Sequence, residues 1–272
     1  MGRGRNEGRA MSLIHHVVAG AGSPPIVFVH GFACSHTDWL AQIDHFSARH
    51  TTVAVDLPGH GATPATAEPA SIERFGTAVA DLLRARTSPP AILVGHSMGC
   101  RVVLDAALRV PEHVAGIVLV DGSRFAPQAV AAFEARFAKG EYKPMLGGMF
   151  EQMFTSRSDP RVVAATLKRA LDLPETVGQP LLLSLAGYDE ERLGQALERI
   201  GKPLLVLQTT YTNEKRERSS MQVGQTTPYL DFVRAKVPAA RIEVLPGLGH
   251  FPQLDAAAET NRLLASFIAA LA

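Results

Sequence analysis

Residues 91–109 read AILVGHSMGCRVVLDAALR. A short apolar run, typical of a buried strand, leads into GHSMG at 95–99, and the residues that follow have a helical composition. Serine in the pattern G-x-S-x-G, between a strand and a helix, sits on a strained turn that holds its hydroxyl outward at the strand end. The N-terminus of the following helix favours negative charge that develops there. The stretch therefore predicts Ser97 as a nucleophile.

The alternation of apolar strands and helices continues on both sides of this stretch. Predicted strands are Leu13–Val18, Ile26–His30, Thr52–Asp56, Ala91–Gly95, Gly116–Asp121, Leu204–Gln208 and Arg241–Leu245. Predicted helices include Ile72–Ala85, Met98–Val110 and Ala256–Leu271. Near-continuous apolar runs such as IVFV and GIVLV indicate strands covered on both faces. The pattern predicts an α/β fold, with a mainly parallel central sheet flanked by helices.

One interval, 123–200, contains helical patterns and no convincing strand. We expect a helical cap insertion there, in a core formed by 12–122 and 201–272, after a disordered extension over 1–11. The insertion is rich in methionine and phenylalanine, which favours an adaptable apolar pocket wall. The predicted pocket residues are Met145, Met149, Phe150 and Phe154. For any one of them taken alone, simple packing onto the core is the better explanation.

Composition excludes several classes of protein. The chain has 272 residues, of which 46% are apolar and 19% charged, so most of it should fold around a core. Lys plus Arg number 27 and Asp plus Glu 26, and no basic stripe indicates nucleic-acid binding. No apolar run is long enough to span a membrane, and no secretory signal is evident. Cys34 and Cys100 lack metal-ligand spacing, so we expect free thiols in a reducing cytoplasm.

No cofactor is expected, since neither a dinucleotide-binding nor a P-loop glycine pattern occurs and no residues have metal-ligand spacing. The predicted partner is a small-molecule substrate with an apolar portion. The oligomeric state stays open.

A serine hydroxyl needs a base to remove its proton. Of the ten histidines, His250 is the strongest candidate, because it lies in GLGHFP at 247–252, between the last predicted strand and the last helix. A glycine-rich loop at the carboxyl edge of a sheet can carry an imidazole to Ser97 from far along the chain. A capping or packing role for His250 is the alternative.

Four motifs occur in an order that resembles the α/β-hydrolase superfamily. They are His30-Gly31 after IVFV, DLPGHG at 56–61, GHSMG at 95–99 and GLGHFP at 247–252. The resemblance covers about residues 12 to 271, and implies an oxyanion hole formed by the backbone N–H groups of Phe32 and Met98. Two fixed donors of this kind suit charge that appears only in the tetrahedral state. The His30 imidazole is expected to hold its loop rather than to contact substrate.

The acid departs from the usual pattern of that superfamily. Its common position, after the strand that follows the insertion, falls on Thr212, and no Asp occurs between Asp189 and Asp231. A variation of the pattern places the acid at the end of the preceding strand, which here is Asp121. We therefore expect Asp121 to orient His250, with Glu214 as the second choice. Less favoured are Asp231, Asp255 or a Ser–His dyad without an acid.

The favoured function is a serine hydrolase that cleaves an ester or related acyl substrate, of the carboxylesterase type. Because a fold does not fix a reaction, carbon–carbon bond hydrolysis, cofactor-free lyase chemistry and oxygenation stay open as alternatives. A ligand receptor with slow turnover is the third possibility.

Overall fold

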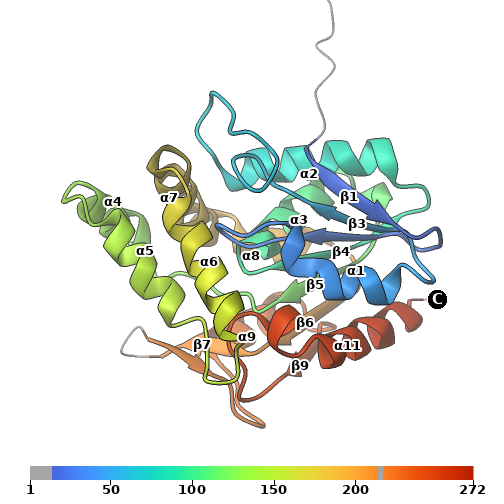
Figure 1. Ribbon diagram of the computed structural model, residues 1–272. Coiled ribbons are helices and arrows are strands. Elements are labelled where there is room, and N and C mark those ends of the chain that lie inside the picture. The colour runs from blue at the N-terminus through green and yellow to red at the C-terminus, as the bar shows by residue number, and fades with distance from the viewer. Residues whose placement is uncertain (1–13, 214–216, 272) are drawn as a thin grey trace, which may run out of the picture.

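The computed structural model describes residues 14–213 and 217–271 of the chain (Figure 1). The predicted extension over 1–11 therefore lies outside the described residues. The strands are β1 (His16–Ala19), β2 (Ile26–Val29), β3 (Thr52–Val55), β4 (Ala91–His96), β5 (Val114–Val120), β6 (Leu204–Gln208), β7 (Thr210–Thr212), β8 (Arg218–Ser220) and β9 (Arg241–Val244).

Seven of these strands form one sheet, in the order β1-β3-β2-β4-β5-β6-β9. Every neighbouring pair is parallel except β1 and β3, which are antiparallel. The predicted, mainly parallel sheet is therefore confirmed. Strands β7 and β8 form a separate antiparallel hairpin that the sequence reading did not include.

Helices cover both faces of the sheet. They are α1 (Leu40–Phe46), α2 (Ile72–Arg86), α3 (Met98–Arg109), α4 (Ala129–Phe137), α5 (Tyr142–Glu151), α6 (Pro160–Asp172), α7 (Glu175–Glu191), α8 (Leu193–Arg199), α9 (Pro228–Lys236), α10 (Pro252–Asp255) and α11 (Ala257–Ala269), with short 3₁₀ helices η1 (His36–Trp39) and η2 (Pro111–His113). On one face, α11 packs Leu264 and Phe267 into a core that includes Phe28 of β2. The opposite face is covered by α2, α3 and α8, whose apolar residues belong to the larger core.

Residues 123–200 contain α4 to α8 and no strand. Figure 1 shows α4, α5, α6 and α7 gathered beside one end of the sheet. Prolines begin or precede two of these helices, since Pro160 is the first residue of α6 and Pro174 the N-cap of α7. Pro180, by contrast, lies inside α7 without ending it.

Both cysteines are buried and unpaired, as the sequence predicted. Burial raises the pKa of both thiols, that of Cys100 to about 12, so neither ionises readily near neutral pH. Within residues 14–213 and 217–271, no helix combines the length and the apolar character needed to cross a membrane.

Candidate active site

Ser97 lies on a strained turn between β4 and α3. Its backbone has φ 54° and ψ −113°, a conformation that residues other than glycine rarely adopt. The flanking glycines are required because backbone atoms crowd them. A Cβ on Gly95 would lie 2.4 Å from the Gly99 carbonyl oxygen, and one on Gly99 would lie 2.5 Å from the Val29 oxygen. This crowding explains why glycine occupies positions 95 and 99, two residues before and after Ser97.

The register of β4 and β5 brings Asp121 to the same edge of the sheet as Ser97. His96 at the end of β4 pairs with Val120 at the end of β5, and the Ser97 N–H donates to the Val120 carbonyl at 2.9 Å. The next residues along the two strands, Ser97 and Asp121, therefore leave the sheet side by side. Asp121 also has a positive φ, 44°.

The loop that carries His250 is held by several hydrogen bonds. The His250 N–H donates to the Met153 carbonyl at 2.7 Å, and the Thr209 hydroxyl donates to the Gly249 carbonyl at 2.8 Å. A Cβ on Gly249 would lie 2.6 Å from the Met153 oxygen, so glycine lets α5 and its following turn approach the loop. These hydrogen bonds fix the position of the loop.

His96 is a positioning residue that sequence reasoning missed. Its Nε2 lies 2.7 Å from the His250 carbonyl oxygen, so Nε2–H donates there and holds the main chain of the candidate base. The two imidazole rings lie 4.7 Å apart between centroids. No sequence signal distinguishes this histidine from a variable position inside GHSMG.

Asp121 contacts His250 directly. Its Oδ2 lies 2.5 Å from His250 Nδ1, and both side chains are almost fully buried. Because an ionised carboxylate only accepts hydrogen bonds, Nδ1 carries the proton and Nε2 keeps its lone pair. That Nε2 is buried and has no hydrogen-bond partner among the described residues. The arrangement leaves one basic nitrogen available, as general-base chemistry requires.

The Asp121 carboxylate accepts hydrogen bonds from other donors as well. Oδ1 accepts from the N–H groups of Thr209 and Thr210 at 2.8 and 2.7 Å, and Oδ2 accepts from the Thr210 hydroxyl at 2.5 Å. Burial raises the pKa of Asp121, but His250, Arg218 and Thr210 together hold it below its ordinary value. Asp121 is therefore an anion near neutral pH.

Arg218 is a second residue that the sequence did not single out, because the run Asn213–Arg218 resembled a solvated loop. The structure places Arg218 in β8 with only 15% of its side chain exposed, and its Nη1 lies 3.6 Å from Asp121 Oδ2. Nη1 donates to the Thr210 hydroxyl at 2.6 Å and lies 3.1 Å from His250 Nδ1. Since Nδ1–H already donates to Asp121, this last contact joins two donors.

The pKa of His250 is lowered to about 4. Burial is the main cause and the positive charge of Arg218 the second, while Asp121 acts in the opposite direction. Three more buried histidines also have lowered pKa values, to about 3 for His30, about 4 for His60 and about 3 for His96, with burial the main cause in each. All four imidazoles are therefore neutral in the folded protein at neutral pH.

Two backbone N–H groups beside Ser97 lack hydrogen-bond partners among the described residues, those of Phe32 and Met98. Met98 is the first residue of α3, where helical N–H groups have no acceptor within the helix. His30 positions the other loop, because its Nδ1–H donates to the Gly31 carbonyl at 2.8 Å and its Nε2 accepts from the Leu57 N–H at 3.0 Å. These contacts match the loop-holding role expected for His30.

A cavity with room for about 80 Å³ lies against this group of residues. It is lined by Phe32, Ser97, Met98, Arg101, Ser123, Arg124, Phe125, Met149, Phe150, Met153, Leu182, Leu185, Thr212 and Arg218. Of the four predicted pocket residues, Met149 and Phe150 line it and Met145 and Phe154 do not. Met145 is buried in the core, and the Phe154 ring stacks on Phe251 at 5.1 Å. Both expectations are corrected for this cavity, since sequence spacing does not show which side of α5 faces the sheet and Phe154 lies after the end of α5 at Glu151.

The other proposed acids do not contact His250. Asp231 pairs with Arg234 on exposed α9, and Asp255 accepts from the Ser158 hydroxyl at 2.8 Å. Glu214 lies outside the described residues. Among residues 14–213 and 217–271, Asp121 is the carboxylate that hydrogen-bonds His250.

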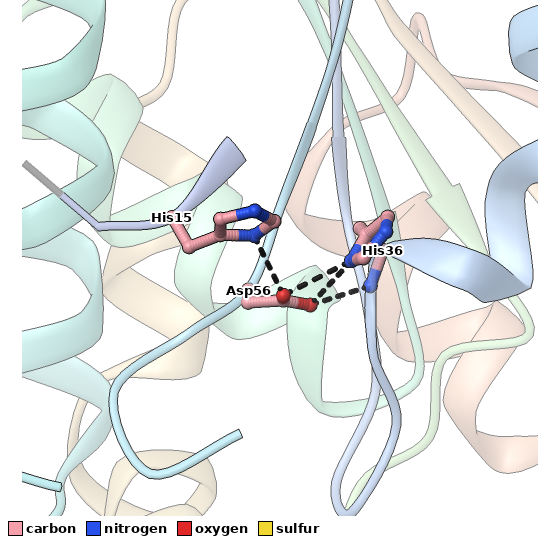
Figure 2. A group of neighbouring side chains, drawn as sticks. All are labelled: His15, His36 and Asp56. Carbon is pink, nitrogen blue, oxygen red and sulfur yellow. Dashed lines mark hydrogen bonds and ion pairs between the residues drawn. The ribbon is translucent and has the colours of Figure 1, made fainter. Parts of the chain in front are cut away.

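Away from Ser97, three side chains form a group of possible metal-ligating type, His15, His36 and Asp56 (Figure 2). Their ligand atoms lie within 4.8 Å of one another. Both Asp56 oxygens already accept hydrogen bonds from the protein, including the His36 N–H at 2.8 Å and the Ala62 N–H at 2.9 Å. We therefore interpret the group as a polar network that joins the residue before β1, η1 and the loop after β3.

Comparison with known proteins identifies the family of the chain. A model of the alpha/beta hydrolase family matches residues 26–263. The dihydrolipoyllysine-residue acetyltransferase component of the acetoin cleaving system of Pseudomonas putida is 27% identical over 92% of this chain, and this chain covers 65% of that relative's length. The pimeloyl-[acyl-carrier protein] methyl ester esterase of Nitrosomonas europaea is 36% identical over 40% of this chain and 41% of the esterase.

Among solved structures, Est816, described as an N-acyl homoserine lactone degrading enzyme, superposes with a TM-score of 0.72 at 25% identity. The match covers 93% of this chain and 96% of that protein. Because the family model spans most of the sequence, the chain belongs to the alpha/beta hydrolase family.

Proposed function

We propose that the protein is a serine hydrolase that cleaves an ester or related acyl substrate, with Ser97 as nucleophile, His250 as general base and Asp121 as the acid that orients it. The observation that carries the proposal is the 2.5 Å contact between Asp121 Oδ2 and His250 Nδ1, which leaves the buried Nε2 without a partner among the described residues. The strained backbone of Ser97 at the same edge of the sheet supports it.

In the first half of the reaction, Ser97 Oγ attacks the acyl carbon while its proton passes to His250 Nε2. The negative charge that forms on the carbonyl oxygen is accepted by the N–H groups of Phe32 and Met98. The tetrahedral intermediate then collapses, the bond to the leaving oxygen breaks, and the alcohol departs with the proton from Nε2. An acyl group remains on Ser97.

In the second half, water gives a proton to Nε2 and attacks the acyl-enzyme, and Ser97 recovers its proton as the carboxylic acid leaves. Asp121 keeps its charge throughout and stabilises the imidazolium that forms twice per cycle. Removing one oxyanion-hole donor typically costs about 10²–10³ in rate, so both N–H groups matter.

We also propose that 123–200 acts as a cap that shapes the acyl-binding cavity, since Met149 and Phe150 of α5 line it together with Ser97. The cavity volume of about 80 Å³ is small, which favours a short acyl group. Similarity to a methyl ester esterase and to a lactone degrading enzyme supports cleavage of an acyl–oxygen bond.

Rapid mixing of the protein with p-nitrophenyl acetate tests this function. We expect a burst of about one p-nitrophenol per chain, followed by steady turnover, and neither phase in Ser97→Ala. A burst without turnover would indicate a receptor-like protein that is acylated once. Turnover retained in Ser97→Ala would exclude Ser97 as the nucleophile.

A further inference from the structure

The lining of the cavity beside Ser97 carries an excess of positive charge. Three arginines line it, Arg101, Arg124 and Arg218, and none of the described lining residues is Asp or Glu. Buried cations are normally paired, so each arginine needs a partner of opposite charge or a set of acceptors. What each one contacts decides which of them is available to a ligand.

Arg101 is fully engaged by the protein. Its guanidinium forms a two-point pair with Asp189, in which Nε and Nη2 lie 2.9 and 2.7 Å from the two carboxylate oxygens. It also donates to the carbonyls of Ser97 and Ser123. The charge and the donors of Arg101 are therefore satisfied, and it supports the turn that carries Ser97.

Arg124 is exposed at the edge of the cavity. Its guanidinium carbon lies 4.4 Å from the centre of the Phe232 ring, in a cation–π contact. One weak hydrogen bond, 3.4 Å from Nε to the Asp189 carbonyl, is its other polar contact among the described residues. Arg124 therefore adds positive charge at the edge of the cavity, with few acceptors around its guanidinium among the described residues.

Arg218 is enclosed but only partly satisfied. Among the described residues, the hydrogen-bond donation from its side chain uses Nη1 alone, and Nε and Nη2 have no acceptor. Among the described residues, the carboxylate paired with Arg218 is that of Asp121, which is 3.6 Å away and already accepts from His250, Thr209 and Thr210. A guanidinium offers five N–H donors in a planar fork that matches a carboxylate. Arg218 thus presents unused donors to the cavity that contains Ser97.

The positive charge of Arg218 also disfavours protonation of His250 when no anion is bound beside it. An imidazolium at His250 forms within 3.1 Å of the Arg218 guanidinium, and like charges this close repel. An anion bound to Arg218 offsets this repulsion. Such an anion therefore favours the protonated base as well as the bound state.

We propose that the acyl part of the substrate carries a carboxylate, which Arg218 binds while Ser97 attacks the acyl carbon. This inference rests on the proposed function, because it places the scissile carbonyl at Ser97. Arg124 strengthens the local positive potential. The substrates are thus half-esters of short dicarboxylic acids, or lactones that carry a free carboxylate, rather than esters of simple fatty acids.

A matched pair of substrates tests the proposal by kinetics. Monomethyl glutarate carries the carboxylate, and methyl pentanoate replaces it with a methyl group. A charge-assisted hydrogen-bonded pair is expected to raise kcat/KM for monomethyl glutarate about 10- to 100-fold over methyl pentanoate. In Arg218→Gln this ratio should fall to within about threefold of one, because activity on the carboxylate ester is lost and the repulsion of protonated His250 no longer slows the neutral ester.

Two further variants separate recognition from folding. Arg218→Lys keeps the charge but loses the planar fork, so it should give an intermediate ratio. Arg262→Gln on α11, which pairs with Glu259 at the surface, is the matched control and should keep the wild-type ratio. Melting temperatures of all variants show whether a loss reflects unfolding.

Binding to Ser97→Ala, measured by calorimetry, needs no turnover. We expect monomethyl glutarate to bind at least about tenfold more tightly than methyl pentanoate, and Arg218→Gln added to Ser97→Ala to abolish the difference. Equal binding, or a preference that survives without Arg218, overturns the proposal. Ser97-dependent hydrolysis of both esters at equal rates would leave the proposed function intact and refute only the carboxylate. Tighter binding of monomethyl glutarate, without ester hydrolysis by the wild type, would instead refute the proposed function and leave the carboxylate site intact.

Discussion

Asp121→Asn exchanges one carboxylate oxygen for an amide nitrogen, and the surrounding hydrogen-bond donors decide which of the two oxygens is replaced. Oδ1 accepts from two backbone N–H groups, of Thr209 and Thr210, which cannot turn away. The amide oxygen must therefore take the place of Oδ1 and the amide NH₂ that of Oδ2. The NH₂ then faces His250 Nδ1, where the wild-type oxygen lies 2.5 Å away.

An amide donor at that place forces Nδ1 to accept, so the proton moves to Nε2. His250 then cannot take the proton of Ser97, because its only basic nitrogen points at residue 121. The same change of tautomer in a serine protease costs about 10⁴ in kcat. We expect kcat/KM of Asp121→Asn on p-nitrophenyl acetate to fall by two to four orders of magnitude.

The fold should survive, because the amide oxygen keeps both backbone hydrogen bonds and the Thr210 hydroxyl can reorient to accept from the NH₂. Steady-state kinetics with circular dichroism and a melting curve check both statements. Glu214→Gln is the comparison, and its activity should stay within about tenfold of wild type. If folded Asp121→Asn also stayed within tenfold, Asp121 would not be the acid, and a large loss in Glu214→Gln would move the role there.

The remaining predictions concern stability and the cavity. The free energy of unfolding should fall below pH 6.5, because the unfolded chain protonates four histidines that the fold keeps neutral down to pKa values of about 3 to 4, namely His30, His60, His96 and His250. Each histidine lowers the free energy of unfolding by up to about 1.4 kcal/mol per pH unit. Urea titrations between pH 7 and 5 measure this dependence, and they would not show it if these histidines were charged in the folded state. Met149→Ala should shift the acyl chain-length preference measured with a series of esters. Met145→Ala should cost about 2–5 kcal/mol of stability and leave that preference unchanged. The opposite pattern would reverse the assignment of these two residues. Gly99→Ala should lower stability by about 1–3 kcal/mol in chemical denaturation, since its Cβ meets the Val29 oxygen at 2.5 Å, and a neutral effect would refute the crowding.

The sheet was predictable because its central strands, β2 to β6, are buried on both faces. Runs such as IVFV and AILV stand out without any knowledge of their partners, and all seven predicted strands occur, with ends displaced by a few residues. Asp121 was identifiable as a candidate because the resemblance to the α/β-hydrolase superfamily allows an acid at the end of this strand and because the usual acid position falls on Thr212. Its contact with His250 depends on how the 247–252 loop is pinned, which sequence does not show.

The hairpin β7–β8 escaped prediction because its strands are short and polar. The run that ends at Arg218, the first residue of β8, has the composition of a solvated loop, and packing against Thr210 and Asp121 buries that side chain. Met145 was misplaced for a related reason, and Phe154 because it lies after the end of α5 at Glu151. Helical spacing identifies apolar residues, but the rotation of α5 against the sheet decides which of them reach the cavity.

Active-site labelling tests the central claim most directly. The wild-type protein is treated with a fluorophosphonate, digested, and mapped by mass spectrometry, beside Ser97→Ala and His250→Ala. We predict one adduct per chain on Ser97, none in Ser97→Ala, and labelling slowed by at least about 10²-fold in His250→Ala, because the proton of Ser97 then lacks an acceptor. An adduct on another residue, or labelling of Ser97 at the wild-type rate without His250, would contradict the account.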